Sequence, residues 1–495
     1  MSLENLENTA NTVVGLKSHI DGDWVDGTAG ELVDDNPARP DEVVARGLLI
    51  GETEVDRAVE AARRAARDWA RQPIHARAAV LSRAADLIER SAQAWGRELT
   101  REEGKTLPEG VGEVMRAAQI LRYVAGAADR ESGSVYSSPR AGEQILVTRK
   151  PVGVVAAVTP FNFPIAIPAW KIAPALVYGN TVVWKPASSV PLLAMRLTEA
   201  LADAGLPPGV LNLLIAGGRV GTTLIEHPGV DAITFTGSTA VGRTIAASAA
   251  ARGVPVQAEM GGKNAAVVLP DADLDLAIEQ VMLGAFRSAG QKCTATSRLV
   301  LHEAVADEFL AGLALRVKAL EVGDPLLDSV AVGPVINAAS RAHIEGRTRD
   351  AVRDGARVLA IAGARESGAD DGHFVTPTVL EAPSTESALW SEELFGPVLA
   401  VLRTPDTDAA FAAANAGEFG LSAAVFTQDV TRILHAMDDI DVGVLHVNSE
   451  SAGADPHVPF GGAKRSGYGP KEQGSAARDF FTHTTTVYLR GGQPA

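Results

Sequence analysis

The chain has 495 residues, of which 46% are hydrophobic and 21% are charged. This length allows two or three domains, each with its own hydrophobic core. The net charge of −16 predicts an acidic surface and argues against nucleic acid as a partner. The single cysteine, Cys293, excludes an intrachain disulfide and a cysteine-rich metal site, so no metal is expected and a reducing cytoplasm suits the chain.

The start of the chain does not match a signal peptide. Residues 1–12 are polar and include Glu4 and Glu7, whereas a signal peptide has a basic and then an apolar segment. The most apolar stretch, residues 152–183, is interrupted by prolines and by Lys171, so it does not match the roughly 20 apolar residues of a membrane helix. We therefore expect a cytoplasmic protein that does not bind a membrane.

The first part of the chain predicts helices followed by a pair of strands. Residues 53–93 are rich in Ala, Arg, Glu and Leu at helical spacing, and Thr53 with Asp56 forms a plausible capping box at their start. A second helical block covers residues 107–128. The β-like residues 144–148 follow a polar stretch and predict a strand pair that leaves the main body.

Two alternations of strands and helices follow. The first runs from residue 151 to about 259 and predicts a parallel sheet with crossover helices, its strands at residues 154–158, 181–184, 211–215, 232–235 and 255–257. The second begins near residues 264–269 and continues to about 426, which predicts another α/β domain. Residues 484–487 predict an exposed terminal strand, and pairing with a neighbouring subunit is one way to supply its partner edge.

Cys293 lies in a segment that favours chemistry over packing. Residues 290–294 (GQKCT) follow an apolar helix-like run at residues 274–286 and place the thiol at a predicted turn. A lone cysteine is most often a small buried apolar residue. A nucleophilic cysteine instead needs access and donors that stabilise its thiolate, and a turn with free backbone amides near a helix start provides both.

Two further polar residues follow predicted strands. Glu259 ends an apolar strand, and a carboxylate at a strand end facing a cleft can act as a general base, although an isolated glutamate is more often solvated or paired. Asn162 follows the strand at residues 154–158, and ligands of parallel sheets bind beyond the carboxyl ends of the strands. A neutral amide donor there can hold a developing oxyanion, but an Asn near prolines also suits a simple turn.

Two segments suit a nucleotide. Residues 181–188 form a predicted strand followed by Lys185 and Ser188, which suit a ribose or its 2′-phosphate. Residues 235–242 predict a strand, a glycine turn and a helix start that can receive a pyrophosphate on backbone amides. The usual G-x-G-x-x-G is absent, and a single glycine turn is a weak signal by itself.

Seven ordered motifs together resemble the aldehyde dehydrogenase superfamily across nearly the whole chain. They are TPFNFP (159–164), WKPAS (184–188), FTGST (235–239), EMGGKN (259–264), GQKC (290–293), EELFGPV (392–398) and PFGGAKRSG (459–467). Within the superfamily, residues 254–269 and 457–487 look closest to α-ketoglutaric semialdehyde dehydrogenases. Succinic semialdehyde and aromatic aldehyde dehydrogenases are similar enough to stay open as alternatives.

The resemblance implies an α/β fold with a Rossmann-type coenzyme domain, a second α/β catalytic domain and a small β oligomerisation element. It places the coenzyme-binding domain at residues 1–128 and 149–258, the catalytic domain at 259–440 (continuing to about 472), and the oligomerisation strands at 129–148 and 473–495. It also implies NADP or NAD as coenzyme, a small aldehyde as substrate, and a homodimer or homotetramer.

Roles carry over from the family to matching residues. Cys293 matches the nucleophile, Glu259 the general base, and Asn162 the oxyanion donor that works with the Cys293 backbone amide. The reaction implied is thiolate attack, hydride transfer to the coenzyme and hydrolysis of a thioester. The matched coenzyme contacts are Thr159, Pro160, Phe161, Lys185, Ser188, Gly237, Ser238, Glu393 and Phe395.

Several other positions concern proton transfer and the choice of coenzyme and substrate. Lys171 and Glu472 match residues proposed for a proton relay in some members, although Pro470 and Lys471 alter the local spacing. NAD-selective members often have Glu at the position of Ser188. The absence of this carboxylate permits NADP as coenzyme. Arg287 matches a residue that binds the substrate carboxylate in succinic semialdehyde dehydrogenases, and the alternative is that Arg287 braces its loop. Those enzymes have a second arginine, and this chain has Trp170 at that position. Trp170 and Phe163 would then form walls of the substrate pocket.

Two other classes of function compete with a hydrolytic aldehyde dehydrogenase. A catalytically silent relative would serve as a structural protein, but the chain retains Cys293, Glu259 and Asn162 together. An acylating dehydrogenase would pass the thioester to coenzyme A, and such members usually lack the base matched by Glu259. Both comparisons favour a hydrolytic aldehyde dehydrogenase.

Overall fold

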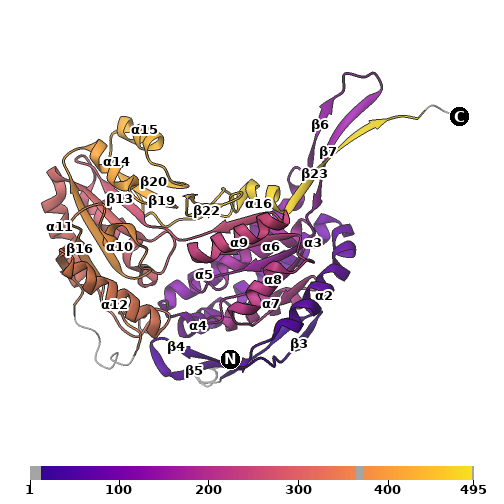
Figure 1. Ribbon diagram of the computed structural model, residues 1–495, viewed down its shortest axis with the longest axis horizontal. Coiled ribbons are helices and arrows are strands. Elements are labelled where there is room, and N and C mark those ends of the chain that lie inside the picture. Colours follow the sequence, from indigo (N-terminus) through magenta and orange to yellow (C-terminus); the bar gives the residue numbers. More distant parts are fainter. Residues whose placement is uncertain (1–12, 364–371, 493–495) are drawn as a thin grey trace.

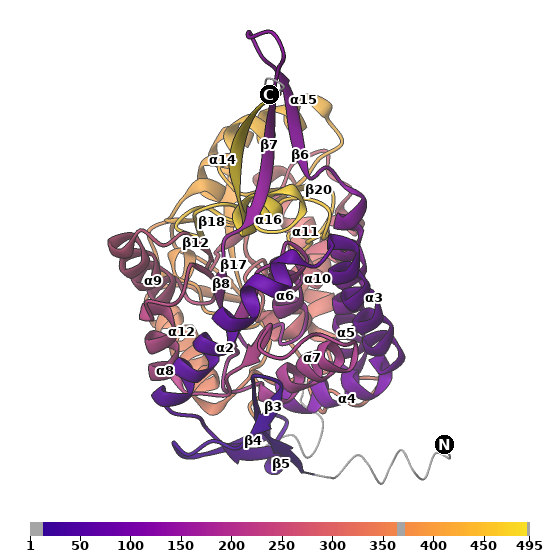
Figure 2. The same ribbon diagram turned by 90° about the vertical axis from the view of Figure 1, so that its right-hand side faces the viewer.

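The computed structural model describes residues 13–363 and 372–492, and its fold is α/β as predicted (Figure 1). Two sheets of mainly parallel strands lie side by side, and a three-stranded arm projects from the body (Figures 1 and 2). The polar start at residues 1–12 and the last three residues of the predicted 473–495 element lie outside the described residues. No helix in the described ranges combines the length and apolarity needed to cross a bilayer.

The first sheet has eight strands in the order β22-β12-β11-β8-β9-β10-β2-β3. Its five central strands are parallel and confirm the five predicted ones, with small differences at their ends: β8 (Val154–Val158), β9 (Thr181–Lys185), β10 (Leu211–Leu213), β11 (Ala232–Thr236) and β12 (Val256–Glu259). The short edge strands β2 (Ser18–Ile20), β3 (Asp23–Val25) and β22 (Gly467–Tyr468) join by antiparallel pairing and were not predicted.

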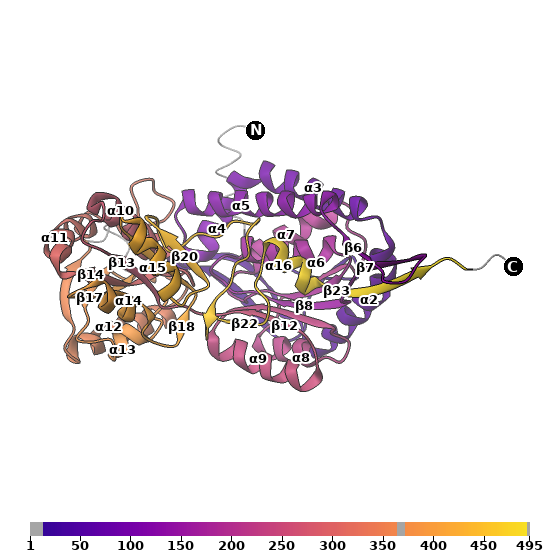
Figure 3. The same ribbon diagram turned by 90° about the horizontal axis from the view of Figure 1, so that it is seen from above.

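Alternate strand residues build the cores on the two faces of this sheet. Val155 and Ala157 of β8 pack into one core, whereas Val154 and Ala156 pack into the other, as the period of two requires. Figure 3 shows the helices on both faces. They are α3 (Ile74–Arg90), α4 (Ala92–Glu103), α5 (Leu107–Ala125), α6 (Ala166–Val177) and α7 (Pro191–Asp203) on the first, and α2 (Glu52–Arg71), α8 (Gly218–Glu226) and α9 (Thr239–Arg252) on the second.

The predicted helical blocks are confirmed, but the predicted first cap is wrong. Helix α2 begins at Glu52, so Thr53 lies inside its first turn. The Gly51 backbone N–H donates to Glu54 Oε2 at 3.0 Å, and this bond closes the helix end instead. No element was predicted before Thr53, where a small sheet forms from β1 (Val14–Leu16), β4 (Glu31–Asn36) and β5 (Arg39–Leu48).

The second alternation forms a seven-stranded sheet in the order β15-β16-β17-β14-β13-β19-β20, parallel except for β15. Its strands are β13 (Asn264–Val268), β14 (Thr296–His302), β15 (Arg357–Ile361), β16 (Thr378–Glu381), β17 (Val398–Thr404), β19 (Ser422–Phe426) and β20 (Val444–Val447). The accompanying helices are α10 (Leu274–Phe286), α11 (Glu303–Lys318), α12 (Ala338–Arg353), α13 (Ala388–Ser391), α14 (Thr407–Asn415) and α15 (Val430–Asp439). The helix-like run at residues 274–286 is thus confirmed as α10.

The arm consists of β6 (Gly133–Ser137), β7 (Glu143–Pro151) and β23 (Thr482–Arg490), with β7 in the middle. It leaves the body as the sequence predicted for the strand pair (Figure 2). The terminal strand β23 pairs along its length with β7 of its own chain. A neighbouring subunit is therefore not needed to supply this partner edge, because helix α16 (Gly474–Phe481) returns the chain to the base of the arm.

Candidate active site

The two sheets meet where β12 ends and β13 begins. Glu259 is the last residue of β12, and Asn264 is the first residue of β13. The Asn264 Nδ2 donates to the carbonyl oxygens of Cys293 and Ala295, both at 2.8 Å. The amide thereby fixes the loop of Cys293 at the junction of the two sheets.

The loop before Cys293 has an unusual backbone. Ser288, Ala289 and Gly290 have φ values of 53°, 51° and 70°, in the left-handed region that costs a non-glycine residue about 1–2 kcal/mol. A Cβ on Gly290 would lie 2.3 Å from the Gly396 carbonyl oxygen, so only glycine fits there. Glu109 of α5 accepts a hydrogen bond from the Ser288 backbone N–H at 2.9 Å, which helps to hold the bend.

Cys293 itself lies in a turn, as predicted, and strand β14 follows it. Burial raises the pKa of the Cys293 thiol to about 12, and the carboxyl groups of Glu393 and Glu259 add to this shift, while a backbone hydrogen bond from Thr294 opposes it. The resting thiol is therefore neutral at pH 7.

A cavity of about 340 Å³ opens onto Cys293. Phe163, Trp170 and Phe460 give it an aromatic wall, and the rings of Trp170 and Phe460 lie 5.8 Å apart. The same cavity is also lined by Lys105, Glu109, Glu113, Arg116, Arg287, Lys292 and Glu450. The pocket thus combines an aromatic wall with several charged groups.

Arg287, the proposed ligand of a substrate carboxylate, lines the cavity beside Cys293. Its side chain is 49% exposed, and its Nε lies 3.5 Å from Glu109 Oε1. Its Nη1 lies 3.9 Å from Glu450 Oε1. Both contacts are longer than a well-formed hydrogen bond, so they leave the guanidinium able to take an anionic ligand.

Asn162 is buried beyond the carboxyl end of β8. Its Nδ2 donates to the Gln291 carbonyl oxygen at 2.8 Å, which ties it to the loop of Cys293. Gln291 is held in turn, because its Oε1 accepts a hydrogen bond from Ile336 N at 2.9 Å. An amide nitrogen carries two hydrogens, so one remains for a ligand.

Glu259 is buried against two glycines of the PFGG segment. Its Oε2 accepts a hydrogen bond from Gly462 N at 2.9 Å. A Cβ on Gly461, whose φ is +155°, would lie 2.1 Å from Glu259 Oε1, so the carboxyl group occupies space that only glycine leaves free. Burial, together with the negative charge of Glu472, raises the pKa of Glu259 well above its ordinary value.

Lys171 and Glu472 form a buried pair despite the altered spacing around Lys471. The Lys171 ammonium donates to Glu472 Oε1 and, at 3.0 Å, to Thr234 Oγ1. Burial raises the pKa of Glu472, and the charge of Lys171 opposes that shift. The structure therefore brings the two predicted relay residues together, next to the element that carries Glu259.

The predicted coenzyme residues gather at the switch point of the first sheet. The strand order reverses at β8, whose neighbours are β9 and β11, and ligands of such sheets bind outside the carboxyl ends at this point. Ser238 is the N-cap of α9 there, while the Thr236 and Thr239 hydroxyls are buried and find no hydrogen-bond partner among the described residues. These groups and the helix N-terminus fit a nucleotide pyrophosphate.

The remaining predicted contacts lie around this point. Thr159, Pro160 and Phe161 follow β8, Lys185 ends β9 with Ser188 just beyond it, and Gly237 N donates to the Glu259 carbonyl oxygen at 3.1 Å. From the second sheet, Glu393 Oε1 accepts a hydrogen bond from Gly262 N at 2.9 Å, and burial raises the pKa of Glu393 to about 7. The Phe395 ring meets the Phe161 ring edge-on at 5.8 Å.

Sequence reasoning missed the charged side chains that α5 brings to the site. Glu109 and Glu113 are four residues apart, so they share one face of the helix. That spacing is visible in the sequence, but charged faces of helices usually point to solvent, and nothing local shows that this one is buried. Among residues 13–363 and 372–492, no cluster of three His, Cys, Asp or Glu side chains is placed to hold a metal ion.

The fold and the site define a coenzyme-dependent oxidoreductase of α/β architecture. The model of the aldehyde dehydrogenase family matches residues 24–487, so the chain belongs to that family, whose members use NAD(P). The seven motifs therefore led to the right family.

Named relatives and solved structures agree with this assignment. The chain is 41% identical to an α-ketoglutaric semialdehyde dehydrogenase of Bacillus subtilis, over 95% of this chain and 97% of that protein. It is 40% identical to an α-ketoglutarate semialdehyde dehydrogenase of Haloferax volcanii, over 95% and 98%. A betaine aldehyde dehydrogenase of Staphylococcus aureus, solved in complex with NAD+, superimposes with a TM-score of 0.93 at 31% identity, covering 100% of this chain and 97% of that one.

Proposed function

We propose that this aldehyde dehydrogenase oxidises a short aldehyde with a distal carboxylate, α-ketoglutaric semialdehyde first and succinic semialdehyde second. The observation that carries the proposal is that Arg287 lines the same cavity as Cys293, with its guanidinium only loosely paired. A fixed guanidinium fork suits a carboxylate held away from the reacting carbon. The two semialdehyde dehydrogenases at about 40% identity support the same substrate class.

The first step is attack of the Cys293 thiolate on the aldehyde carbon, which gives a hemithioacetal with a negatively charged oxygen. The free N–H of the Asn162 amide and the Cys293 backbone N–H stabilise that oxygen. Because the resting thiol has a raised pKa, its proton must leave before attack.

The coenzyme, NADP or NAD, accepts the hydride that leaves the hemithioacetal carbon. In this proposal Lys185 contacts the adenosine ribose, Ser238 and the α9 N-terminus contact the pyrophosphate, and Glu393 contacts the nicotinamide ribose; their positions around the switch point support these roles. Ser188 presents no negative charge beside Lys185, which supports NADP as a coenzyme at least as good as NAD.

Hydrolysis of the resulting thioester completes the reaction. Glu259 takes a proton from a water molecule, the hydroxide adds to the acyl carbon, and the acid leaves as the Cys293 thiolate re-forms. A carboxylate with a raised pKa is a stronger base than an exposed one, which suits this role. The buried pair of Lys171 and Glu472, whose charges act on Glu259, is assigned to pass the proton onward in this proposal.

An aromatic aldehyde is the second candidate. The rings of Trp170 and Phe460, inclined at 42° to each other, form an aromatic wall beside Cys293, and Phe163 adds to it. A planar ring would stack against this wall without any need for Arg287.

The test replaces Arg287 with leucine and compares two substrates of similar length. For the semialdehyde, we expect kcat/KM to fall about 30-fold, the equivalent of about 2 kcal/mol for a lost charge-assisted pair. For an uncharged aldehyde, the change should be much smaller. Equal losses for both substrates would show that Arg287 only braces the loop, and the aromatic candidate would then be preferred.

We also propose that the enzyme is a homodimer or homotetramer. Apolar side chains of the arm are exposed in the single chain, among them Val135 at 72% and Tyr488 at 59%. Exposed apolar groups on a projecting sheet favour association with another copy. Sedimentation at several concentrations would test this, and a monomer at all of them would contradict it.

A further inference from the structure

A buried lysine lies under the loop that carries Asn162. Lys105 follows Gly104 in the turn between α4 and α5, and its side chain is 2% exposed. Its ammonium donates to Glu113 Oε2 at 2.8 Å and lies 3.7 Å from Glu103 Oε2. Two carboxyl groups thus compensate a charge that would otherwise be costly to bury.

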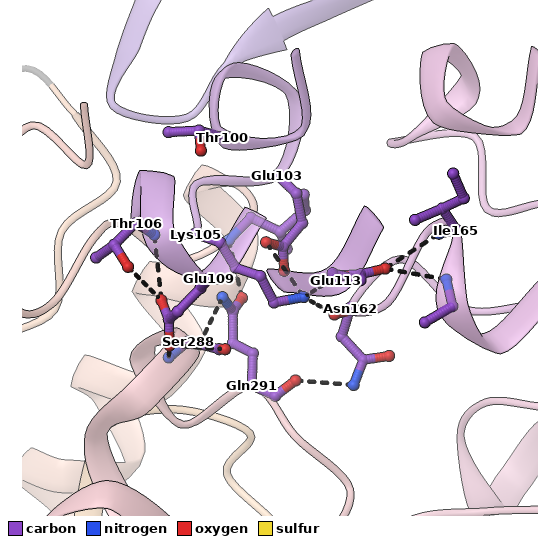
Figure 4. Close-up of polar contacts among 12 residues, drawn as sticks. Thr100, Glu103, Lys105, Thr106, Glu109, Glu113, Asn162, Ile165, Ser288 and Gln291 are labelled. Carbon is purple, nitrogen blue, oxygen red and sulfur yellow. Dashed lines mark hydrogen bonds and ion pairs between the residues drawn. The ribbon is translucent and has the colours of Figure 1, made fainter. Parts of the chain in front are cut away.

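The same ammonium reaches the active-site loop. It donates a hydrogen bond to the backbone carbonyl oxygen of Asn162 (Figure 4). It also lies 3.9 Å from the centre of the Phe163 ring. Hydrogen bonds from a charged donor are about twice as strong as neutral ones, and burial strengthens them further. Lys105 therefore holds the backbone of the residue whose side chain faces the Cys293 loop.

Helix α5 fixes the other side of this loop as well. Glu113 Oε1 accepts hydrogen bonds from Ile165 N at 3.1 Å and Ala166 N at 3.2 Å, which lie at the start of α6 (Figure 4). One turn earlier on α5, Glu109 holds Ser288 N in the loop before Cys293. A single helix face thus sets the spacing between Asn162 and the nucleophile loop.

We propose that Lys105, held by Glu113 and Glu103, is a positioning residue for the Asn162 amide. It fixes the Asn162 backbone so that one side-chain N–H stays on the Gln291 carbonyl and the other stays at the oxyanion position. The inference rests on the oxyanion role proposed for Asn162. Catalytic groups must hold their geometry closely, and a displacement of about 1 Å can cost on the order of 100-fold in rate.

The experiment measures the burst of reduced coenzyme at saturating aldehyde in Asn162→Ala, Lys105→Met and the double variant. Removal of an oxyanion donor should slow the burst by about 100-fold or more. Lys105→Met should slow it by about 10- to 100-fold. If Lys105 acts through Asn162, the double variant should be no more than about threefold slower than Asn162→Ala alone.

Further measurements separate positioning from a general loss of structure. The coenzyme dissociation constant and the alkylation rate of Cys293 should stay unchanged in Lys105→Met. The loss should be equal for the semialdehyde and for an uncharged aldehyde, because Lys105 does not serve as a substrate ligand. Arg101→Met is the matched control. It removes a different buried cation, on α4, which pairs with Glu42 at 2.7 Å away from the loop, and it should keep the wild-type burst rate.

The outcomes distinguish the two proposals. An unchanged burst in Lys105→Met, or a double variant in which the two losses multiply, would overturn the positioning role and leave the role of Asn162 standing. A normal burst in Asn162→Ala would remove both. If Lys105→Met does not fold, Glu113→Gln keeps the side-chain volume and the bonds to α6 but turns an amide toward Lys105; it should slow the burst by about tenfold, and a wild-type burst would overturn the proposal.

Discussion

The two walls of the active site are built in different ways. Glu259 and Lys185 are the last residues of two regular parallel strands, β12 and β9. Cys293 instead follows an irregular loop with three consecutive residues in the left-handed region. We call the side of the site formed by these strand ends the strand-end wall, and the side formed by the loop before Cys293 the loop wall. The backbone hydrogen bonds of the sheet set the geometry of the strand-end wall. The loop wall instead depends on side chains from other elements, chiefly Glu109 and Asn264. A regular element can place a catalytic group by itself, but a loop needs partners distant in sequence.

The largest effect is expected on the loop wall. Cys293→Ala removes the only thiol, so dehydrogenase activity should fall by about 10⁴-fold or more, the scale seen when a catalytic nucleophile is removed. Coenzyme binding should persist, because the strand-end wall supplies it. Steady-state reduction of coenzyme and equilibrium titration measure the two. Ordinary turnover in this variant would contradict the covalent mechanism.

A smaller but sharper effect is expected on the strand-end wall. Glu259→Gln should retain the burst of reduced coenzyme and then lose steady-state rate by about 10²- to 10⁴-fold, because only the hydrolytic step lacks its base. Rapid-mixing kinetics would show the burst. A variant with no burst would contradict this assignment, because Glu259 would then be needed before hydride transfer.

Two glycines with the same backbone angle test how tightly the loop wall is held. Gly290 and Gly253 have φ values of 70° and 68°, but only Gly290 has a carbonyl oxygen 2.3 Å from the position of a Cβ. Gly253→Ala should cost about 1 kcal/mol in the free energy of unfolding, and Gly290→Ala about 2–4 kcal/mol. Thermal unfolding of both variants compares the costs. Equal decreases in the thermal unfolding midpoint would show that the loop can shift to accommodate the added methyl group.

The pH dependence of Cys293 reactivity tests the environment that both walls create. With a pKa raised to about 12, the thiol is neutral at pH 7, and the thiolate fraction grows about tenfold for each pH unit below that value. The rate of alkylation by iodoacetamide in the free enzyme should therefore keep rising from pH 7 to pH 10. A plateau below pH 9 would mean that the thiol ionises in its ordinary range.

The smallest effect is expected at the rim of the strand-end wall. Ser188→Glu places a carboxylate beyond β9, where it would repel a 2′-phosphate and bind ribose hydroxyls. The ratio of kcat/KM for NADP over NAD should fall by about tenfold, without a change in the alkylation of Cys293. A native enzyme that binds NAD far more tightly than NADP would show that Ser188 does not decide the preference.

What could be predicted from the sequence follows the same division. The parallel strands, their order along the chain and the strand-end residues were predictable, because β-rich runs and polar residues at their ends are local signals. The left-handed bend at Ser288 and Ala289 was not, since non-glycine residues rarely adopt it and no short pattern marks it. Lys105 and Glu113 were missed because their burial depends on contacts with Asn162 and Ile165, about 50 residues away. The cap at Thr53 was wrong because the equivalent contact forms two residues earlier, between the Gly51 backbone N–H and Glu54.

The presence of one cysteine in the whole chain has a practical consequence for counting enzyme molecules. Every thiol that a colour-forming disulfide reagent finds in the unfolded protein is that of Cys293, so the protein concentration and the thiol concentration must be equal. A shortfall in thiols measures directly the fraction of molecules whose Cys293 has been oxidised. Since no second cysteine exists in the chain to form a disulfide with a sulfenic acid at Cys293, repair of that first oxidation step requires a thiol supplied from outside.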